Sequence, residues 1–432
     1  MPTAAFTTLG CKVNQYETQR ILESFEEGGF EVVPFDSAAD VYVINSCSVT
    51  SIAESKSRYT IRRASRLNPD AKVVVTGCAA QMAVNKGETL EGADLVVPNP
   101  EKLETFKRFR QKFPDLGPSI TNVSEGAVGL SLGRTRATLK VQDGCNAMCS
   151  YCSIPFTRPG MVSRHAEEVL SEAEKLRDLG YRELVLTGVL IGAYGPDSGS
   201  GGPDFEELVD MISDSVGPGV RIRISSIELG QVTNRLIDLV LGGKVVPHLH
   251  IPLQCGNDQV LMDMNRKYTQ AAYTARCKEI QALVPGLSLS TDILVGFPTE
   301  TEDRFESSAE VCREVGFVKV HVFRFSPRWG TPADRFGDPV SPQEKQRRSV
   351  VLSQIGAVTR QLHAEQFLGR TLRVLVEGKL TPEGLLEGLT DNYLDVRFAG
   401  PKSLQRQFAE VRIEEVREGY CYGELVTRPL AP

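Results

Sequence analysis

The sequence predicts an α/β protein in three parts: an amino-terminal domain with a parallel sheet, a central open (β/α)6 partial barrel, and a small antiparallel β-barrel at the carboxyl end. Three observations lead to this prediction. Apolar segments alternate with helix-like stretches in the first hundred residues, the alternation recurs between residues 137 and 325, and the chain beyond residue 367 consists of short strands and turns. We place the domains at residues 1–125, 130–365 and 367–432.

Three short apolar segments lie in the first eighty residues, and each leads directly to a cysteine. AAFTTLG precedes Cys11, DVYVINS precedes Cys47 and AKVVVTG precedes Cys78. Their unbroken apolar character is typical of buried strands in a parallel sheet. Because such sheets bind ligands at the carboxyl ends of their strands, the cysteines should share one edge. A single cysteine is often only a buried filler, but the same placement on three strands favours a three-cysteine metal site.

The central part begins after a loop rich in Gly, Ser and Pro, from Gly117 to Gly133, which we interpret as a domain linker. Six strand-like segments follow, separated by helical stretches. They are Ala137–Gln142, Glu183–Gly188, Arg221–Ile227, His248–Leu253, Leu287–Val295 and Val318–Phe325. Six units are too few for a closed eight-unit barrel but enough for an open one, and the loops at its carboxyl edge should carry the chemistry.

A second group of cysteines follows the first strand of this barrel. Cys145, Cys149 and Cys152 stand in a Cys-x3-Cys-x2-Cys arrangement. Three thiolates this close can bind three irons of a 4Fe–4S cube and leave the fourth iron open. A structural zinc site usually has four protein ligands, and no fourth is nearby. A chance cluster of buried cysteines would not explain the spacing, so the pattern favours an iron–sulfur cluster.

The tail alternates apolar and polar residues at Leu372, Val374 and Val376, with glycines between the segments. This pattern predicts a small barrel. Such barrels commonly bind oligonucleotides, although a packing or interaction module would show the same pattern.

Composition restricts the class of protein further. Hydrophobic residues make up 41% of the 432 residues and charged residues 24%, which excludes a disordered chain. We expect a cytoplasmic protein without a membrane partner, because neither a long apolar run nor a secretory leader is visible. The net charge of −6 does not indicate non-specific electrostatic binding to the phosphates of nucleic acid. Any RNA contacts would therefore be made by local basic runs. Two runs are candidates, and each could equally be only a solvated helix face. They are Arg58, Arg62, Arg63 and Arg66, and Lys345, Arg347 and Arg348.

These features together resemble the radical S-adenosylmethionine methylthiotransferases over essentially the whole chain. The segment GCKVNQYE at Gly10–Glu17 is most similar to the threonylcarbamoyladenosine tRNA branch, and the tail, with GLTDNYLDV at Gly388–Val396, is similar to a TRAM domain. Further matching segments are RIRISSIE at Arg221–Glu228, HLHIPLQ at His248–Gln254, MNRKYT at Met264–Thr269, TDILVGFPTE at Thr291–Glu300 and RWGTPA at Arg328–Ala333.

The resemblance implies a transferase with two 4Fe–4S clusters and S-adenosylmethionine. It assigns one cluster to Cys11, Cys47 and Cys78 and the other, which cleaves S-adenosylmethionine, to Cys145, Cys149 and Cys152. The residues expected to contact S-adenosylmethionine lie at strand ends, and each could equally be a turn glycine or a polar core residue. They are Gly188, Ser226, Glu228, Gln254 and Gly296.

The implied reaction is methylthiolation of carbon 2 of N6-threonylcarbamoyladenosine next to the tRNA anticodon, where an unpaired loop exposes the base. The implied partners are tRNA, through its anticodon loop, and an electron donor such as flavodoxin or ferredoxin. Three alternatives remain open: another tRNA adenosine of the isopentenyl type, a ribosomal-protein aspartate, or a non-catalytic metal-binding RNA adaptor.

Overall fold

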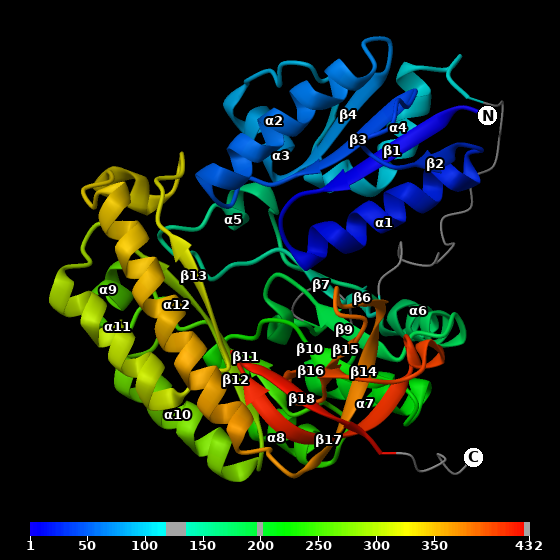
Figure 1. The fold of residues 1–432 in the computed structure, drawn as a ribbon. Coiled ribbons are helices and arrows are strands. Elements are labelled where there is room, and N and C mark those ends of the chain that lie inside the picture. Colours follow the sequence, from blue (N-terminus) through cyan, green and yellow to red (C-terminus); the bar gives the residue numbers. More distant parts are fainter. Residues whose placement is uncertain (118–134, 197–201, 427–432) are drawn as a thin grey trace.

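The computed structural model describes residues 1–117, 135–196 and 202–426, so the predicted linker from Gly117 to Gly133 lies outside the described residues except for Gly117. Figure 1 shows the amino-terminal domain in blue above the green and yellow barrel, with the orange and red tail packed against the barrel. The α/β class with three parts is therefore confirmed.

The amino-terminal domain is a five-stranded parallel sheet in the order β2-β1-β3-β4-β5. Alternate residues of the central strand β3 face opposite layers, since Tyr42 and Ile44 pack in one apolar cluster and Val41 and Val43 in another. The strands are β1 Thr3–Thr8, β2 Glu31–Val33, β3 Val41–Ser46, β4 Lys72–Gly77 and β5 Leu95–Val97. The helices are α1 Lys12–Glu27, α2 Ser51–Leu67, α3 Cys78–Lys86 and α4 Thr105–Lys112, the last preceded by the 3-10 helix Asn99–Glu104.

Helices cover both faces of this sheet, so its strands are buried on two sides. Side chains of α2 and α3, such as Ile61 and Ala80, pack on one face. Those of α1 and α4, such as Phe25 and Phe109, pack on the other.

Six parallel strands form the open barrel in the order β6-β9-β10-β11-β12-β13. The two halves join where the Ile227 amide donates to the His250 carbonyl oxygen at 2.9 Å. In the part of the chain that the structure describes, β6 and β13 do not pair, so the barrel stays open as predicted. The strands are β6 Ala137–Lys140, β9 Glu183–Thr187, β10 Arg221–Ile224, β11 His248–His250, β12 Ser288–Val295 and β13 Lys319–Arg324.

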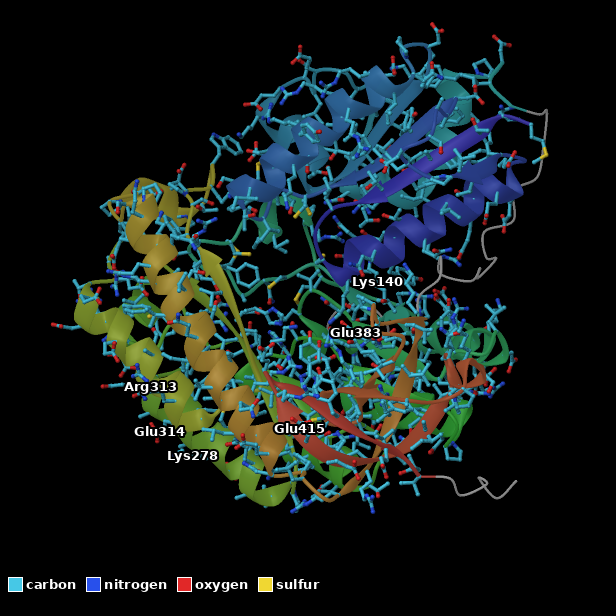
Figure 2. All side chains as sticks on the ribbon, viewed as in Figure 1. Lys140, Lys278, Arg313, Glu314, Glu383 and Glu415 are labelled. Carbon is cyan, nitrogen blue, oxygen red and sulfur yellow. The ribbon has the colours of Figure 1, made fainter. Side chains whose placement is uncertain are left out.

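Helices cover the outside of the barrel and close its apolar core. They are α6 Ala166–Asp178, α7 Phe205–Val216, α8 Asn234–Leu241, α10 Gln270–Leu283, α11 Glu302–Val315 and α12 Pro342–Glu365. Short elements in the loops are β7 Gln142–Asp143, α5 Ile154–Thr157, β8 Val162–Ser163 and α9 Asp258–Asp263, with 3-10 turns at Ile191–Ala193, Leu229–Gln231 and Pro332–Phe336. Figure 2 shows Lys140 at the junction with the amino-terminal domain, whereas Lys278 and Glu314 lie on the outer helices.

The tail is a closed five-stranded barrel in the order β14-β15-β16-β18-β17. One feature of the prediction is wrong, because β16 and β18 pair in parallel while the other pairs are antiparallel. The segment between β16 and β17, which contains the 3-10 helix Lys402–Leu404, carries the chain across the barrel. The strands are β14 Thr371–Leu380, β15 Leu386–Thr390, β16 Asp395–Phe398, β17 Phe408–Arg417 and β18 Tyr420–Leu425.

Polar contacts fix the tail barrel to the central barrel. Arg221 on β10 donates to the Leu389 carbonyl oxygen at 2.9 Å, and Arg223 donates to the Thr390 carbonyl oxygen at 3.2 Å. His248 stacks on Tyr393, with 4.0 Å between ring centroids. Among the described residues, no helix is long and apolar enough to cross a membrane.

Candidate active site

The three amino-terminal cysteines lie at the carboxyl ends of adjacent strands. Cys11 follows β1 and caps helix α1, Cys47 follows β3 directly, and Cys78 is the first residue of α3 after β4. Cys47 and Cys78 are buried and Cys11 is exposed. All three therefore lie along one edge of the sheet, as the strand pattern predicts.

Close packing holds Cys47 beside the turn that carries Cys11. A Cβ atom at Gly10 would lie 2.9 Å from the Cys47 sulfur, and Gly10 has a φ of +103°, so glycine suits this position on both counts. Burial raises the pKa of the Cys47 thiol to about 11, and the neighbouring Cys78 and Cys11 add to this rise. Metal binding would have to displace the thiol protons.

The second group of cysteines occupies the loop between β7 and α5. The Ala147 amide donates to the Cys145 sulfur at 3.4 Å, and the Arg266 guanidinium donates to the Cys149 sulfur at 3.3 Å. Burial raises the pKa of the Cys152 thiol to about 12, and Cys149, Cys145 and Cys78 raise it further. Helix α3, which begins at Cys78, lies against α5, which follows Cys152, because the Asn85 amide donates to the Phe156 carbonyl oxygen at 2.8 Å. The two groups therefore lie on facing segments.

The thiol sets suit iron–sulfur clusters by their chemistry. Within residues 1–117, 135–196 and 202–426, no three His, Cys, Asp or Glu side chains converge to hold one metal ion. The ligands of a single ion must meet at one point, whereas thiolates on a 4Fe–4S cube bind separate irons and stay further apart. The thiols of Cys145, Cys149 and Cys152 are half-buried, and Arg266 and a backbone amide are directed at sulfur, so this donor set suits a cluster.

The five residues predicted to contact S-adenosylmethionine lie at or just beyond strand ends of the barrel. Glu228 forms an ion pair with Arg266, which also contacts Cys149, so it is connected to the cysteine loop. Ser226 is exposed and forms an isolated parallel β-bridge with His250. Gln254 has a φ of +66° and forms a β-bridge with Ile293. Of these three residues, Glu228 is therefore connected to the cysteine loop by a chain of side-chain contacts.

Packing alone explains the glycines at the other two predicted positions. A Cβ atom at Gly188 would lie 3.0 Å from the side-chain oxygen of Gln142. Gly296 has a φ of +74° and packs against the Lys345 side chain. Glycine at 188 and 296 therefore needs no cofactor to account for it.

Sequence reasoning missed two residues beside the cysteine loop. Gln142 is fully buried and accepts hydrogen bonds from the Val189 and Leu190 amides at 3.0 and 2.9 Å, which fixes the loop after β9. Arg266 lies in the MNRKYT segment, but nothing in that segment indicates a contact with Cys149.

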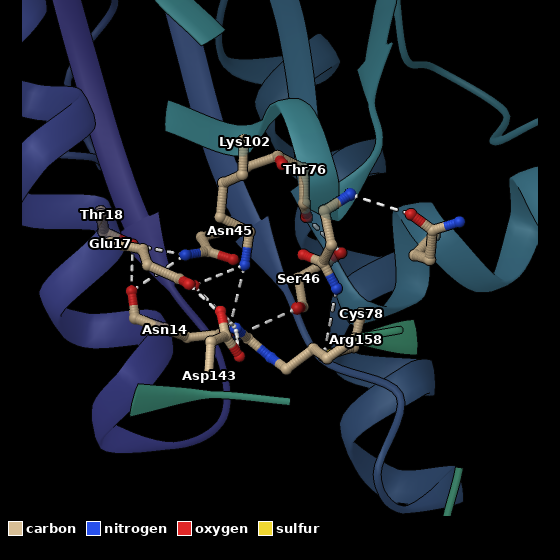
Figure 3. A network of polar contacts seen from close by, with 12 residues as sticks. Asn14, Glu17, Thr18, Asn45, Ser46, Thr76, Cys78, Lys102, Asp143 and Arg158 are labelled. Carbon is tan, nitrogen blue, oxygen red and sulfur yellow. Dashed lines mark hydrogen bonds and ion pairs between the residues drawn. The ribbon is translucent and has the colours of Figure 1, made fainter. Parts of the chain in front are cut away.

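A buried charge network joins the amino-terminal domain to the barrel (Figure 3). Glu17 on α1 accepts hydrogen bonds from Lys102 at 2.6 Å, from Lys140 at 2.7 Å and from both terminal nitrogens of Arg158. Burial alone would raise the pKa of the Glu17 carboxyl, but these three cations hold it well below its usual range. Asp143 adds ion pairs to Lys140 and Arg158 at 2.6 and 2.7 Å.

All three cations of one basic run form ion pairs. Lys345 pairs with Asp338, Arg347 pairs with Glu302 and Glu344, and Arg348 pairs with Glu300 at 2.8 Å. Carboxylates near in sequence (Asp338, Glu344) and remote from it (Glu300, Glu302) therefore pair with this run, and its contact with RNA stays a prediction. In the other run, Arg58 and Arg63 are paired with carboxylates. Arg62 and Arg66 are exposed, and within the described residues neither has a carboxylate partner.

Three known families match successive parts of the chain. Residues 3–98 match the Uncharacterized protein family UPF0004, residues 139–312 match the Radical SAM superfamily, and residues 365–426 match the TRAM domain. A solved structure of the radical S-adenosylmethionine methyltransferase TsrM from Kitasatospora setae shares the fold, with a TM-score of 0.51 and 14% identity over 77% of this chain and 74% of that one.

Relatives that are similar over nearly the full length identify the family of the whole chain. The threonylcarbamoyladenosine tRNA methylthiotransferases MtaB of Bacillus subtilis and Thermotoga maritima are 39% and 34% identical to it, over 98% and 97% of this chain and 96% of each relative. A tRNA-2-methylthio-N(6)-dimethylallyladenosine synthase of Staphylococcus aureus is 32% identical, over 98% of this chain and 85% of the relative. The chain therefore belongs to the radical S-adenosylmethionine methylthiotransferases, a family of transferases whose chemistry implies a 4Fe–4S cluster and S-adenosylmethionine, and within it resembles the threonylcarbamoyladenosine tRNA enzymes.

Proposed function

We propose that the protein methylthiolates carbon 2 of N6-threonylcarbamoyladenosine next to the tRNA anticodon. The observation that carries this proposal is the 39% identity, over 98% of the chain, with a Bacillus subtilis enzyme named for that reaction. The two facing groups of three cysteines support it, because the reaction needs both a radical source and a sulfur donor. Membership of an enzyme family speaks against a non-catalytic RNA adaptor.

Cys145, Cys149 and Cys152 would hold the cluster that acts on S-adenosylmethionine. When bound, this cluster supplies the electron that splits S-adenosylmethionine and generates a 5′-deoxyadenosyl radical. Arg266 would fix Cys149 and orient Glu228 toward the cofactor, since it contacts both side chains. Ser226, Gln254, Gly188 and Gly296 would line the same side of the barrel, with the two glycines acting mainly through packing.

Cys11, Cys47 and Cys78 would hold a second 4Fe–4S cluster that carries the sulfur to be transferred. A thiolate does not attack an unactivated aromatic C–H bond at neutral pH. The sulfur must therefore bond to a carbon that radical chemistry has activated. This requires the two cysteine groups to stay close and their surroundings to exclude water. The hydrogen bonds of Asn85 and Asn99 to the segment after Cys152 and the buried network around Glu17 support this arrangement.

The tail barrel and the exposed Arg62 and Arg66 are the proposed contacts for the anticodon loop. Small barrels of this type bind single-stranded nucleic acid in grooves that combine cations with aromatic rings. The tail offers such pairs, since Arg397 lies 3.8 Å from the Tyr420 ring centroid and Arg417 lies 4.3 Å from that of Tyr422. Electrons would come from a donor such as flavodoxin or ferredoxin.

The proposal is tested with protein reconstituted anaerobically with iron and sulfide. It is incubated with S-adenosylmethionine, a reductant and an anticodon stem–loop RNA that carries N6-threonylcarbamoyladenosine, and the nucleosides are analysed by mass spectrometry. We expect the 2-methylthio nucleoside. Release of 5′-deoxyadenosine with no methylthiolated nucleoside from any RNA would contradict the proposal.

A second candidate substrate is N6-dimethylallyladenosine, because the Staphylococcus aureus relative named for that product is also similar over 98% of this chain. The same assay with an RNA that carries this base decides between the two. We expect the threonylcarbamoyl RNA to react faster. A ribosomal-protein aspartate substrate would give no nucleoside product with either RNA.

A further inference from the structure

A cavity of about 640 Å³ lies where all three parts of the protein meet. Helix α1 contributes Lys12, strands β6, β9 and β10 contribute Thr138, Val185 and Arg223, and the tail contributes Tyr393. This volume is within the range of pockets that bind small molecules or a single modified base.

The charges around this cavity are unequal. Its lining includes five cationic side chains, Lys12, Arg136, Arg223, Lys379 and Arg397, against three carboxylates, Glu183, Glu377 and Glu387. Each carboxylate is already paired with an arginine. Arg223 pairs with Glu183 at 2.8 Å. Arg136 pairs with Glu377 at 2.7 Å, and Arg397 pairs with Glu387 at the same distance. Within residues 1–117, 135–196 and 202–426, neither lysine forms an ion pair with a carboxylate.

Lys12 is the better placed of the two lysines. Its side chain is accessible to water inside the cavity, and among the described residues no carboxylate lies within ion-pair distance of it. Arg223 and Arg136 act on its ammonium group with the same sign of charge, and Glu183 and Asp292 act on it with the opposite sign from beyond ion-pair distance. Such a site favours a bound anion, whose negative charge would pair with the Lys12 ammonium group.

Lys12 also directly follows Cys11, the cysteine that caps α1. In adenine, C2 and C6 are both bonded to N1, so a base whose C2 faces the Cys11 edge has its N6 substituent along the same edge of the ring. The threonylcarbamoyl substituent ends in a carboxylate, which is the type of anion the cavity favours.

We propose that this cavity binds the N6 substituent of the target adenosine and that Lys12 pairs with its carboxylate, which makes Lys12 a specificity-determining residue. This inference rests on the proposed function. Tyr393 forms the aromatic side of the pocket, and the Arg223 guanidinium lies 5.2 Å from its ring centroid. An RNA phosphate would offer Lys12 the same charge, so the experiment has to separate the two anions.

The test compares three stem–loop RNAs: one with the threonylcarbamoyl carboxylate free, one with it converted to a methyl ester, and one with unmodified adenosine. Their affinities for the reconstituted protein and for Lys12→Gln and Lys12→Arg are measured by fluorescence anisotropy at one fixed salt concentration. We expect the native protein to bind the free acid about tenfold more tightly than the ester. Lys12→Gln should abolish this preference and Lys12→Arg should keep most of it.

Lys107→Gln on the exposed face of α4 is the matched control and should keep the full preference for the acid. Equal loss of affinity for all three RNAs in Lys12→Gln would assign the lysine to an RNA phosphate and overturn the inference. Equal binding of acid and ester by the native protein would overturn it too, whether or not Lys12→Gln folds. Binding is measured without turnover, so a native protein that discriminates but makes no methylthio nucleoside would contradict the proposed function alone.

Discussion

Glu17 and Arg158 form a buried, two-pronged ion pair, with 2.7 Å between Glu17 Oε2 and Arg158 Nη2 and 2.9 Å between Oε1 and Nη1. Glu17 lies on the helix that Cys11 caps, and Arg158 lies just beyond the loop that ends at Cys152. The pair therefore links the helix that follows Cys11 to the end of the short helix that follows Cys152. Asn99 adds a second link, because its amide donates to the Thr157 carbonyl oxygen at 2.6 Å.

The first prediction concerns Glu17→Gln. This change leaves Lys140 and Arg158 with Asp143 alone and removes the carboxylate that pairs with the buried Lys102. We expect a loss of about 3 kcal/mol of stability, measured by urea unfolding. We also expect more 5′-deoxyadenosine per methylthio product, because the cysteine groups would be less firmly held together.

Glu314→Gln is the control for this variant. Glu314 pairs with Lys278 at 2.6 Å, but both side chains are exposed on the outer helices (Figure 2). A surface pair contributes about 0–1 kcal/mol, so this change should leave stability and coupling unaltered. Equal behaviour of the two variants would show that the Glu17 network does not hold the domains in register.

The second prediction concerns the loop from Cys145 to Cys152. Replacing Cys145, Cys149 and Cys152 with alanine should abolish 5′-deoxyadenosine formation, because these thiols are the proposed anchors of the cluster that cleaves S-adenosylmethionine. About half of the iron should remain, held by the amino-terminal cysteines. Chromatography of 5′-deoxyadenosine after incubation with reductant checks this outcome, and persistent cleavage would refute the assignment.

The third prediction concerns pH and Glu183. This carboxyl is fully buried, and although burial alone would raise its pKa, Arg223 and Arg221 lower it to about 2. A lowered pKa in the folded state contributes stability above the unfolded value near 4.3, and this stability is lost as pH falls toward 2. Its size is about 3 kcal/mol.

The midpoint temperature of unfolding, measured from pH 7 to pH 3, tests this prediction. The native protein should lose stability steeply below about pH 4.3, where the unfolded chain takes up a proton that the folded chain does not. Glu183→Gln should be less stable at pH 7 and should lose less on acidification. Parallel curves for the two proteins would show that Glu183 is not the group responsible.

The sequence predicts the strands of the barrel and the cysteine positions well, because long apolar runs and repeated strand-to-cysteine placement are local features. Strands β2 and β5 are missed because three residues are too short to show a period. The parallel pairing of β16 with β18 depends on distant strands, and so does the ion pair between Glu17 and Arg158, which are 141 residues apart. Local patterns contain no signal for such contacts.

The same limit applies to the ion pairs of the basic run at Lys345, Arg347 and Arg348. From its sequence, a run of cations in one helix is expected to face solvent. In the folded chain, Glu300 and Glu302 pack against this run and form ion pairs with it. The cavity at Lys12 was also beyond sequence reasoning, since its lining comes from three parts of the chain.

The central claim is that Cys11, Cys47 and Cys78 hold a second cluster, and the iron content of single alanine variants tests it most directly. Cys312→Ala is the matched control, since Cys312 is buried in helix α11 away from both cysteine groups. We expect about eight irons per chain in the native protein and in Cys312→Ala. Because a cluster with two remaining protein ligands is lost cooperatively, Cys47→Ala should retain about four irons, still release 5′-deoxyadenosine and transfer no methylthio group. A Cys47→Ala protein that keeps its full iron and loses only about 1–2 kcal/mol of stability would contradict the account and make Cys47 an ordinary core residue.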